Sequence, residues 1–469
     1  MSAQHDPVVR TTSGDVRGRW RGPSAAFLAI PYAEAPVGPL RFAAPVPRQP
    51  WEGVRDAYRY GPTAQVEPLG PVTTIPEPST PGDDVLNLNV FTPDPGGAGL
   101  PVLVWIHGGG YMAGCQNSSW YDGATFNCDG IVTVSIGYRL GAEAWLHIDG
   151  APDNRGALDW VAGLTWVRDN IAAFGGDPSR VTIAGQSAGG GAALDLLAMP
   201  SAEGLFVRAM GISSAIMDED AGHAAELAQE FASFTGIPAA ADSLKRIDRY
   251  ELARLTKRFS AGPGDQADVK FAPFADGDVL PRPVVAALRD GCGRVPVLLG
   301  STSHEFNMSG DAFAGLDTDE AARVLVGFGV GESEARRLAE EYAGRPEQLL
   351  GQALTDTTFR GLVLDVAAAH AATAPTWLYQ FDWRSAVNGL AFHCLDLPFW
   401  WNRLAGERVE DATGPNPPQR LATAMHEAMV AFIEGGDPGW PAASVAEPSA
   451  RLWQDPPTDQ AGYIHVIGR

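Results

Sequence analysis

Five short runs of apolar residues stand out along the chain, each bordered by glycine, proline or other turn-forming residues. They are PVLVWIH (101–107), GIVTVSIGY (130–138), VTIAG (181–185), VPVLLG (295–300) and TWLYQFDW (376–383). Apolar runs without polar alternation are typical of strands buried on both faces, as in a parallel sheet covered by helices. The pattern predicts that these runs are strands of a mostly parallel central sheet.

A helical pattern separates the second run from the third. Apolar residues recur at helical spacing between positions 158 and 171, after Asn154, which is a candidate N-cap. Gly175 and Gly176 can then end the helix in a left-handed conformation. Strand, helix and strand in this order form a βαβ unit, so the chain is predicted to have an α/β fold.

Two later segments, 221–290 and 311–372, are rich in Ala, Leu and Glu. We expect them to be helical insertions that build a cap or the walls of a cleft. The Pro- and Gly-rich stretches 62–82 and 93–101 are flanked by strand-like runs and are interpreted as loops, not as interdomain linkers. Residues 1–469 are therefore expected to form a single domain.

Composition narrows the classes of partner. The chain is 45% hydrophobic and 19% charged, as in globular proteins, and its formal charge of −22 disfavours nucleic acid and anionic membranes. The N-terminus MSAQHDPVVR lacks the apolar region of a secretory signal, and no apolar run has transmembrane length. The four cysteines are scattered without metal-site or redox spacing, which favours a reduced, cytoplasmic protein. A disulfide between Cys115 and Cys128 is left open.

The run VTIAG continues into a glycine-rich turn, giving VTIAGQSAGGG at 181–191. Alone, this pattern fits either a catalytic serine or a small-residue turn that lets a strand and a helix pack closely. In a parallel α/β fold, a strand–turn–helix places Ser187 at the carboxyl end of its strand, where a nucleophile is exposed. A phosphate-binding loop is disfavoured, because no Gly-Lys-Ser/Thr follows.

A nucleophilic serine needs a base and an orienting carboxylate, which in α/β hydrolases follow in the order Ser, acid, His, each after a strand. Glu305 follows the run VPVLLG, and His393 follows the run TWLYQFDW. The competing histidines are less well placed, in predicted helices (His370, His426) or near the end of the chain (His465). Order and placement favour Glu305 and His393.

The third requirement is a set of donors for the tetrahedral oxyanion. HGGGYMAG at 107–114 follows a predicted strand and exposes N–H groups without obstructing side chains. Gly109 and Gly110, together with Ala188 after the nucleophile, are the candidate oxyanion hole. The alternative, a merely flexible glycine loop, is less consistent with the serine motif downstream.

Taken together, the chain resembles the type-B carboxylesterases, the cholinesterase-like branch of the α/β hydrolases, and within it the bacterial para-nitrobenzyl-esterase-like members. The resemblance spans nearly the whole chain and is carried by FLAIPYA (27–33), GPLRF (38–42), DDVLNLNVFTP (83–93), HGGGYMAG, YRLG (138–141), WVRDNIAAFGGDPSRVTIAGQSAGG (166–190), HE (304–305), HCLDLPF (393–399) and GDPGWP (436–441). It implies the α/β-hydrolase fold, Ser187 as nucleophile, Glu305 as acid and His393 as base. It also implies structural ion pairs of Arg41 with Asp83 and of Arg139 with Asp159.

Departures from the family pattern bear on the substrate. Gln186 stands where the family usually has glutamate, and Val85 where secreted members have a cysteine. The stretch 65–84 offers no aromatic platform for quaternary ammonium, so choline esters are disfavoured. The sequence SSA (213–215) replaces the usual QSG, which is expected to alter support of the acid–base pair.

The resemblance thus implies a serine carboxylesterase that acts through an acyl-enzyme on a small-molecule ester, without metal or cofactor. Gln186 and a set of aromatic residues are candidates for the substrate pocket, which would favour neutral, apolar or aromatic esters: Tyr111, Trp120, Trp145, Phe399, Trp400 and Trp401. Amide or carbamate hydrolysis and natural-product acyl transfer are open alternatives, and a non-catalytic binding protein is disfavoured by the intact triad. Monomer and homodimer are both left open.

Overall fold

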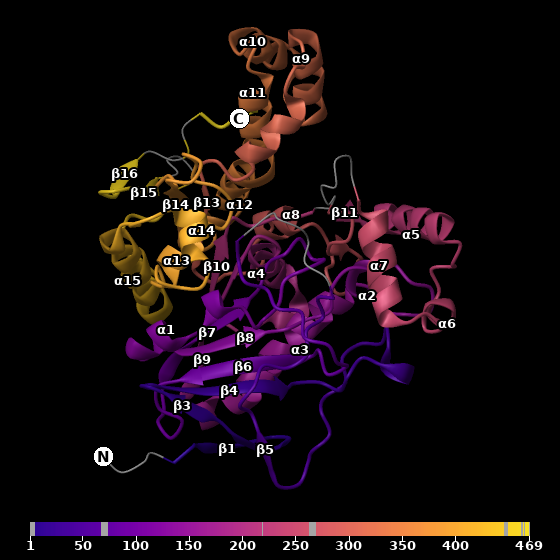
Figure 1. The fold of residues 1–469 in the computed structure, drawn as a ribbon, viewed down its shortest axis with the longest axis vertical. Helices are drawn as coiled ribbons and strands as arrows, with labels where there is room; N and C mark the ends of the chain where they lie inside the picture. The colour runs from indigo at the N-terminus through magenta and orange to yellow at the C-terminus, as the bar shows by residue number, and fades with distance from the viewer. Residues whose placement is uncertain are drawn as a thin grey trace.

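A sheet of eleven strands forms the centre of the protein (Figure 1). The computed structural model describes residues 5–66, 74–217, 219–261, 269–444, 449–460, 463 and 465–468. Parts of the predicted loop 62–82 and of the predicted helical segment 221–290, namely 67–73 and 262–268, lie outside the described residues.

The strand order places seven parallel strands at the centre of this sheet. In spatial order they are β15 (Ala450–Trp453), β14 (Thr376–Phe381), β13 (Val297–Thr302), β10 (Arg208–Ile212), β9 (Gly176–Gln186), β7 (Leu100–Ile106) and β8 (Val132–Ile136). The five apolar runs correspond to β7, β8, β9, β13 and β14. Each of them is confirmed as a buried strand.

The edges of the sheet are antiparallel, which the five runs did not indicate. β6 (Asn87–Thr92), β4 (Ser24–Pro31) and β3 (Arg19–Arg21) extend one edge, and β16 (Thr458–Gln460) closes the other. A separate small sheet contains β1 (Val8–Thr11), β2 (Gly14–Arg17) and β5 (Val54–Asp56), and β11 (Glu219–Asp220) pairs with β12 (Phe274–Ala275).

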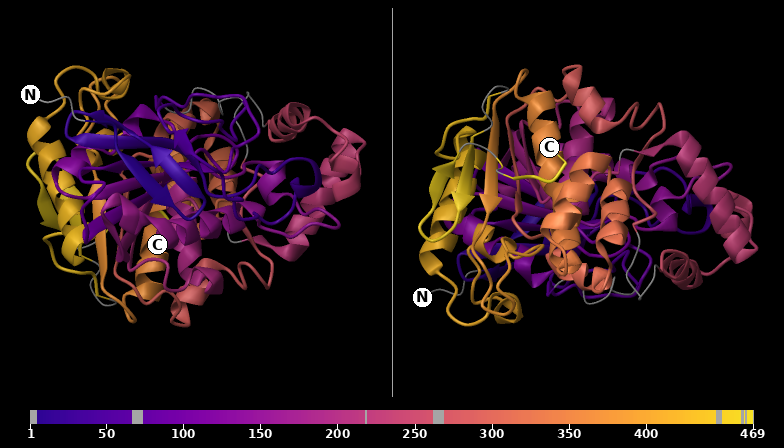
Figure 2. Two further views of the ribbon diagram at one scale, coloured as in Figure 1. Left: turned by 90° about the horizontal axis from the view of Figure 1, so that it is seen from below. Right: turned by 90° about the horizontal axis from the view of Figure 1, so that it is seen from above.

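Helices cover both faces of the sheet (Figure 2). One face packs against α3 (Arg155–Asn170), α4 (Ala188–Ala198), α8 (Val284–Arg289) and α12 (Gly361–His370), and the other against α1 (Ala124–Cys128), α13 (Leu397–Trp400) and α15 (Gln419–Gly435). Along β7, Val102 and Val104 enter the first core, whereas Leu103 and Trp105 enter the second. Alternate side chains of a strand point to opposite faces, so an unbroken apolar run serves two cores at once.

The two predicted insertions are helical. The first contains α5 (Ala221–Thr235), α6 (Ala241–Leu244), α7 (Arg249–Phe259) and α8. The second contains α9 (Thr318–Gly327), α10 (Glu332–Glu341), α11 (Pro346–Thr355) and α12, and Figure 1 shows α9–α11 as a lobe that projects from the body. The remaining helices are α2 (Ala142–Trp145) and α14 (Val409–Thr413). No helix among the described residues is long and apolar enough to cross a bilayer.

Asn154 occupies the N-cap position of α3, as predicted, but its side chain does not cap the helix. Its amide nitrogen donates instead to the carbonyl of Phe274, at 2.7 Å, and to Asp276. The residue therefore ties the start of α3 to the first insertion. Gly175 does adopt the left-handed conformation that ends this helical region, with φ 88°.

Of the two implied ion pairs, one is confirmed and one is wrong. Arg139 Nη2 lies 2.7 Å from Asp159 Oδ1, and both side chains are buried. Arg41 pairs with Glu143, at 2.9 Å, and not with Asp83. Its guanidinium also donates to the carbonyl of Leu244, which draws it toward α2 and α6.

The cysteines are free thiols. Cys115 and Cys394 are buried, Cys128 is exposed and Cys292 is partly buried. The disulfide left open between Cys115 and Cys128 is therefore not formed.

Candidate active site

Ser187 sits in the single-residue turn between β9 and α4, with φ 58° and ψ −124°. This conformation is costly for a residue with a Cβ, and such strain persists only where surrounding bonds enforce it. Here the N–H of Ser187 donates to Ile212, and its carbonyl accepts from Gly191 and Ala215. The strand and the neighbouring loop thus hold the serine at the carboxyl end of the sheet.

The glycines on either side of Ser187 are required by close backbone contacts. A methyl group at Gly185 would lie 2.2 Å from the carbonyl oxygen of Gly189, and one at Gly189 would lie 2.1 Å from that of Ile106. The small-residue interpretation of VTIAGQSAGGG is therefore correct. It is also compatible with a nucleophile, because the same close packing forces the sharp turn that presents the serine.

The structure brings Glu305 and His393 together beneath this turn. Glu305 follows β13 and is fully buried, and its Oε2 lies 2.5 Å from Nδ1 of His393. The backbone N–H of His393 also donates to the carbonyl of Glu305, at 3.0 Å. An ionised carboxylate only accepts, so Nδ1 carries the hydrogen and Nε2 keeps its lone pair.

Two hydrogen-bond donors hold the other carboxylate oxygen of Glu305. Ser213 Oγ and the backbone N–H of Thr302 both donate to Oε1 of Glu305, each at 2.6 Å. Bonds to the charged form of a carboxylate favour that form. The arrangement suits an acid that stays ionised and orients the imidazole.

The imidazole packs against two phenylalanine rings. The ring of Phe306 stacks on His393 with centroids 4.8 Å apart, and that of Phe359 lies 5.0 Å away. Phe359 belongs to a π-helical turn, Asp356–Arg360, between α11 and α12. Such turns are often found at functional sites, and this one directs a ring from the second insertion onto the base.

The side chain of Gln186 reaches the remaining ring nitrogen. Its Nε2 lies 3.0 Å from Nε2 of His393, and the residue is buried. The residue at which the sequence departs from the family pattern is thus in direct contact with the base.

The predicted donor loop lies against the serine. It follows β7, and a methyl group at Gly108 would lie 3.1 Å from Cβ of Ser187. Gly109 has φ 110°, and its carbonyl accepts from Met112 and Ala113. Among the described residues, the N–H groups of Gly109, Gly110 and Ala188 donate to no carbonyl or side chain.

The aromatic pocket candidates lie within the cores of the protein instead of lining an open cleft. Tyr111 donates its hydroxyl to Ala215 and packs on Trp145, and Trp120 donates its ring N–H to Glu407. Phe399, Trp400 and Trp401 are fully buried. Trp400 donates its ring N–H to Asp396, and the ring of Phe399 packs against that of Phe381.

Asp396, which the sequence analysis did not single out, is a second buried carboxyl group close to the triad. Its Oδ2 accepts from the hydroxyl of Tyr379, at 3.0 Å, and from the ring N–H of Trp400, at 3.3 Å. Burial raises the pKa of Asp396 to about 7, and the charge of Glu305 acts in the same direction. This carboxyl group therefore titrates near neutral pH.

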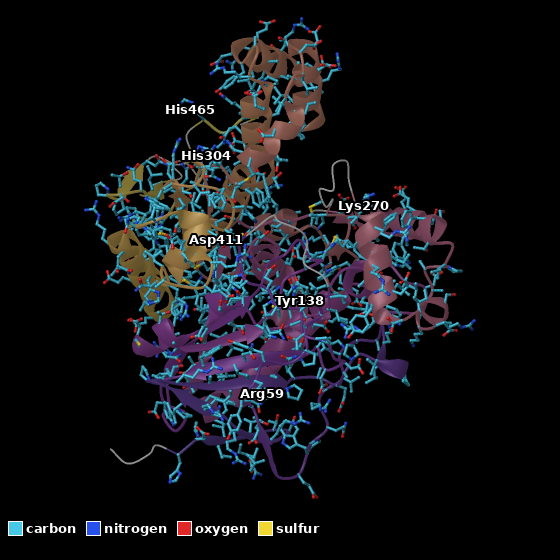
Figure 3. The ribbon with its side chains drawn as sticks, viewed as in Figure 1. Arg59, Tyr138, Lys270, His304, Asp411 and His465 are labelled. Carbon is cyan, nitrogen blue, oxygen red and sulfur yellow. The ribbon has the colours of Figure 1, made fainter. Side chains whose placement is uncertain are left out.

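A polar cavity of about 590 Å³ lies between the lobe and the loop that carries the acid. His304, next to Glu305, and His465, near the C-terminus, both line it, and Figure 3 shows them at the base of the lobe. Burial lowers the pKa of His304 to about 4, and Arg384 adds to this effect. His304 is thus neutral at pH 7 and places no charge beside the acid.

The supporting residues Thr302, Phe306 and Phe359 were not predicted. The sequence SSA at 213–215 was expected to alter support of the acid–base pair, and Ser213 does bond Glu305. Thr302 acts through its backbone, which carries no sequence signal, and Phe359 lies inside a helical segment where an aromatic residue is unremarkable.

Comparison with known proteins agrees with this architecture. The profile of the carboxylesterase family matches residues 5–466. The para-nitrobenzyl esterase of Bacillus subtilis (strain 168) is 34% identical over 93% of this chain and 92% of its own length. The phenmedipham hydrolase of Pseudarthrobacter oxydans is 32% identical over 96% and 95%.

Solved structures show the same likeness. A para-nitrobenzyl esterase aligns with a TM-score of 0.86 at 31% identity, covering 97% of both chains. A carboxylesterase of Geobacillus stearothermophilus also has a TM-score of 0.86, at 34% identity and the same coverage. The chain therefore belongs to the carboxylesterase family, has the α/β-hydrolase fold and is a serine carboxylic ester hydrolase.

Proposed function

We propose that this hydrolase cleaves neutral, apolar or aromatic carboxylic esters through an acyl-enzyme on Ser187. The observation that carries the proposal is the buried contact of 2.5 Å between Glu305 and His393 beside the strained turn of Ser187. A serine on such a turn, a histidine whose Nε2 is the basic nitrogen and an orienting carboxylate are the parts that acyl transfer requires.

In the first half of the reaction, Nε2 of His393 accepts the hydroxyl proton of Ser187 while Oγ attacks the ester carbonyl carbon. The carbonyl oxygen becomes an oxyanion that accepts from the N–H groups of Gly109, Gly110 and Ala188. His393 then returns the proton to the departing alkoxide, so the alcohol leaves and an acyl-serine remains.

In the second half, His393 takes a proton from water, which attacks the acyl carbonyl carbon. Collapse of the second tetrahedral intermediate returns the proton to Oγ of Ser187 and releases the carboxylic acid. Glu305 stays ionised throughout and stabilises the imidazolium that forms in each half.

The surroundings of the base support a neutral, apolar substrate. Phe306 and Phe359 cover the imidazole, and Gln186 carries no charge. An apolar lining binds hydrocarbon by removing it from water, whereas a charged ester would lose hydration without gaining a partner.

The proposal is tested with chromogenic esters of graded acyl length, together with an amide and a carbamate that share one acyl or leaving group. We expect the esters to be cleaved best and Ser187→Ala to lose roughly 10⁴–10⁶ in turnover. If Ser187→Ala retained the wild-type rate, the assignment of Ser187 as the nucleophile would be wrong. Faster cleavage of the matched amide or carbamate would show that the protein prefers that bond to an ester bond.

We also propose that the chain is one domain, located in the cytoplasm and present as a monomer or homodimer. Support for the location comes from four free cysteines, which a reducing compartment favours. Sedimentation of the purified chain tests its oligomeric state, fractionation of the producing cells tests its location, and a single cooperative unfolding transition would support one domain.

A further inference from the structure

The hydrogen bond between Gln186 and His393 occupies the atom that catalysis needs. Nδ1 of His393 is bonded to Glu305, so Nε2 is the basic nitrogen. Nε2 of Gln186 lies 3.0 Å from it and, being an amide nitrogen, can only donate. A neutral ring nitrogen has one lone pair in the ring plane, and Gln186 takes it.

The carboxamide of Gln186 is held in this position from several sides. Its side chain also bonds the thiol of Cys394, the residue next to the base. The backbone at Gly108 also lies close to this carboxamide, since a methyl group at Gly108 would be 3.1 Å from Oε1 of Gln186. Gln186 is 1% exposed and ends β9, whose pairing with Ile212 of β10 fixes its backbone.

The contact places Gln186 in competition with the nucleophile. Within the described residues, no hydrogen bond joins Oγ of Ser187 to the imidazole. Ser187 directly follows Gln186, the last residue of β9, and the proposed mechanism needs the same lone pair to accept its hydroxyl proton. Ser187 can transfer its proton only after the amide has given up that site.

We propose that Gln186 is a positioning residue that holds His393 in a resting hydrogen bond. This bond breaks when the ester binds, so that Nε2 of His393 becomes available to accept from the hydroxyl of Ser187. This inference rests on the proposed function, because it assumes that Ser187 and His393 form the nucleophile–base pair. In the resting state no proton moves, and the amide hydrogen stays on Gln186. After release, the hydroxyl of Ser187 donates to Nε2, and that proton crosses to the imidazole as Oγ attacks.

The residue type matters because a carboxylate at this position would act in the opposite way. Glutamate cannot donate to Nε2 when ionised, so it would leave the lone pair free. It would also place a negative charge beside the imidazolium and stabilise it. With glutamine at this position, Nε2 of His393 is hydrogen-bonded before the ester binds. The imidazolium that forms later is not stabilised by a negative charge at residue 186.

Two variants separate these effects. Gln186→Met keeps the approximate shape and removes the donor, and Gln186→Glu removes the donor and adds a charge. Gln229→Met and Gln229→Glu are matched controls, because Gln229 is exposed on α5, a helix that contributes no residue to the site described above. Each purified protein is mixed with a neutral para-nitrophenyl alkylphosphonate, and the second-order rate constant of labelling is measured without ester present.

We expect Gln186→Met to be labelled about three- to tenfold faster than the wild type, the range that corresponds to one net hydrogen bond. Gln186→Glu is expected to move the acidic limb of the kcat/KM profile to higher pH by roughly half a unit to one unit. The Gln229 variants should match the wild type in both measurements.

A purely structural role predicts a different result. Gln186→Met would then be labelled at the wild-type rate or more slowly, and Gln186→Glu would leave the acidic limb in place; either result overturns the inference. If Gln186→Met does not fold, two other measurements test the inference. They are the pH profile of the isosteric Gln186→Glu variant and the ¹⁵N chemical shift of Nε2 of His393 in the wild type. A wild-type shift typical of an unbonded nitrogen refutes the resting bond. Labelling that persists in Ser187→Ala would instead refute the proposed function itself.

Discussion

Ser213 Oγ donates a 2.6 Å hydrogen bond to Oε1 of Glu305, although the two residues are 92 positions apart in the chain. Ser213 follows β10, the strand that lies between those preceding Ser187 and Glu305. Its φ of 44° is held by the bond from its backbone N–H to the carbonyl of Gly300. A strained residue on the intervening strand thus orients the proposed acid.

Replacing Ser213 is expected to impair turnover more than binding. In Ser213→Ala, Glu305 keeps the bond from Thr302 but loses one donor, so the imidazole is less firmly oriented. We expect kcat to fall about tenfold, equivalent to about 1.4 kcal/mol, with KM changed less than about twofold. Steady-state kinetics with a neutral ester measure both. Ser214→Ala is the control, because Oγ of Ser214 is buried without a hydrogen-bond partner among the described residues; equal losses in both variants would contradict the assigned support.

A methyl group at Gly189 is expected to disrupt the turn of the nucleophile. It would meet the carbonyl oxygens of Ile106 and His107, at 2.1 and 2.7 Å, and neither backbone can move without disturbing the sheet. Gly189→Ala should lower the melting temperature by several degrees or prevent folding, and any folded protein should be nearly inactive. Gly327→Ala, at an open position in α9, should be neutral or stabilise by up to about 1 kcal/mol. Normal activity in Gly189→Ala would show that the contact can relax.

Asp396 is expected to make stability depend on pH. Its folded pKa of about 7 lies above the value of about 3.9 for an unfolded aspartate, so between these values the native state holds a proton that the unfolded chain has lost. The free energy of unfolding therefore falls as pH rises through that window, by an amount of the order of 4 kcal/mol. Asp396→Asn should remove this slope. Urea unfolding at pH 4.5 and pH 8 measures it, and parallel changes in both proteins would contradict the assignment.

The buried pair of Arg139 and Asp159 is expected to serve stability alone. Both oxygens of Asp159 accept from Arg139, including its backbone N–H. Asp159→Asn should lose about 3 kcal/mol, because it leaves a buried guanidinium without its counter-charge. Asp169→Asn, in the exposed pair with Arg168, should lose less than about 0.5 kcal/mol. Denaturant titration tests both, and a lower kcat in folded Asp159→Asn would indicate a role in chemistry.

The parts of the site that follow strands could be predicted from the sequence. Ser187, Glu305 and His393 each come shortly after an apolar run, and the carboxyl ends of parallel strands meet at one edge of a sheet. Their proximity therefore follows from strand order, and Glu305 and His393 are in contact in the structure. Of the antiparallel edge strands, β3 and β16 were missed because they are short and only partly apolar.

Residues that act across the fold could not be predicted. Arg41 was assigned to Asp83, yet the carbonyl of Leu244 and the carboxylate of Glu143 compete for the same guanidinium. Trp400 and Phe399 were interpreted as pocket residues because they follow the base closely. Short helix α13 instead turns both rings into the core, where Trp400 finds Asp396 as a partner for its N–H. Distance along the chain does not determine the direction of a side chain.

The order of strands β9, β10, β13 and β14 also determines the stage of synthesis and folding at which the chain can become an active hydrolase. The pairings of β13 with β10 and with β14, which align the proposed acid and base with the nucleophile, join segments 88 and 79 positions apart in the chain. Forming such a pairing closes a long loop, which costs conformational entropy before the strand contacts stabilise it. These pairings therefore form slowly. A nascent polypeptide therefore stays catalytically silent until the segment carrying His393 has been synthesised and docked. Recovery of activity after denaturation accordingly reports completion of the whole parallel sheet, and not formation of any local unit within it.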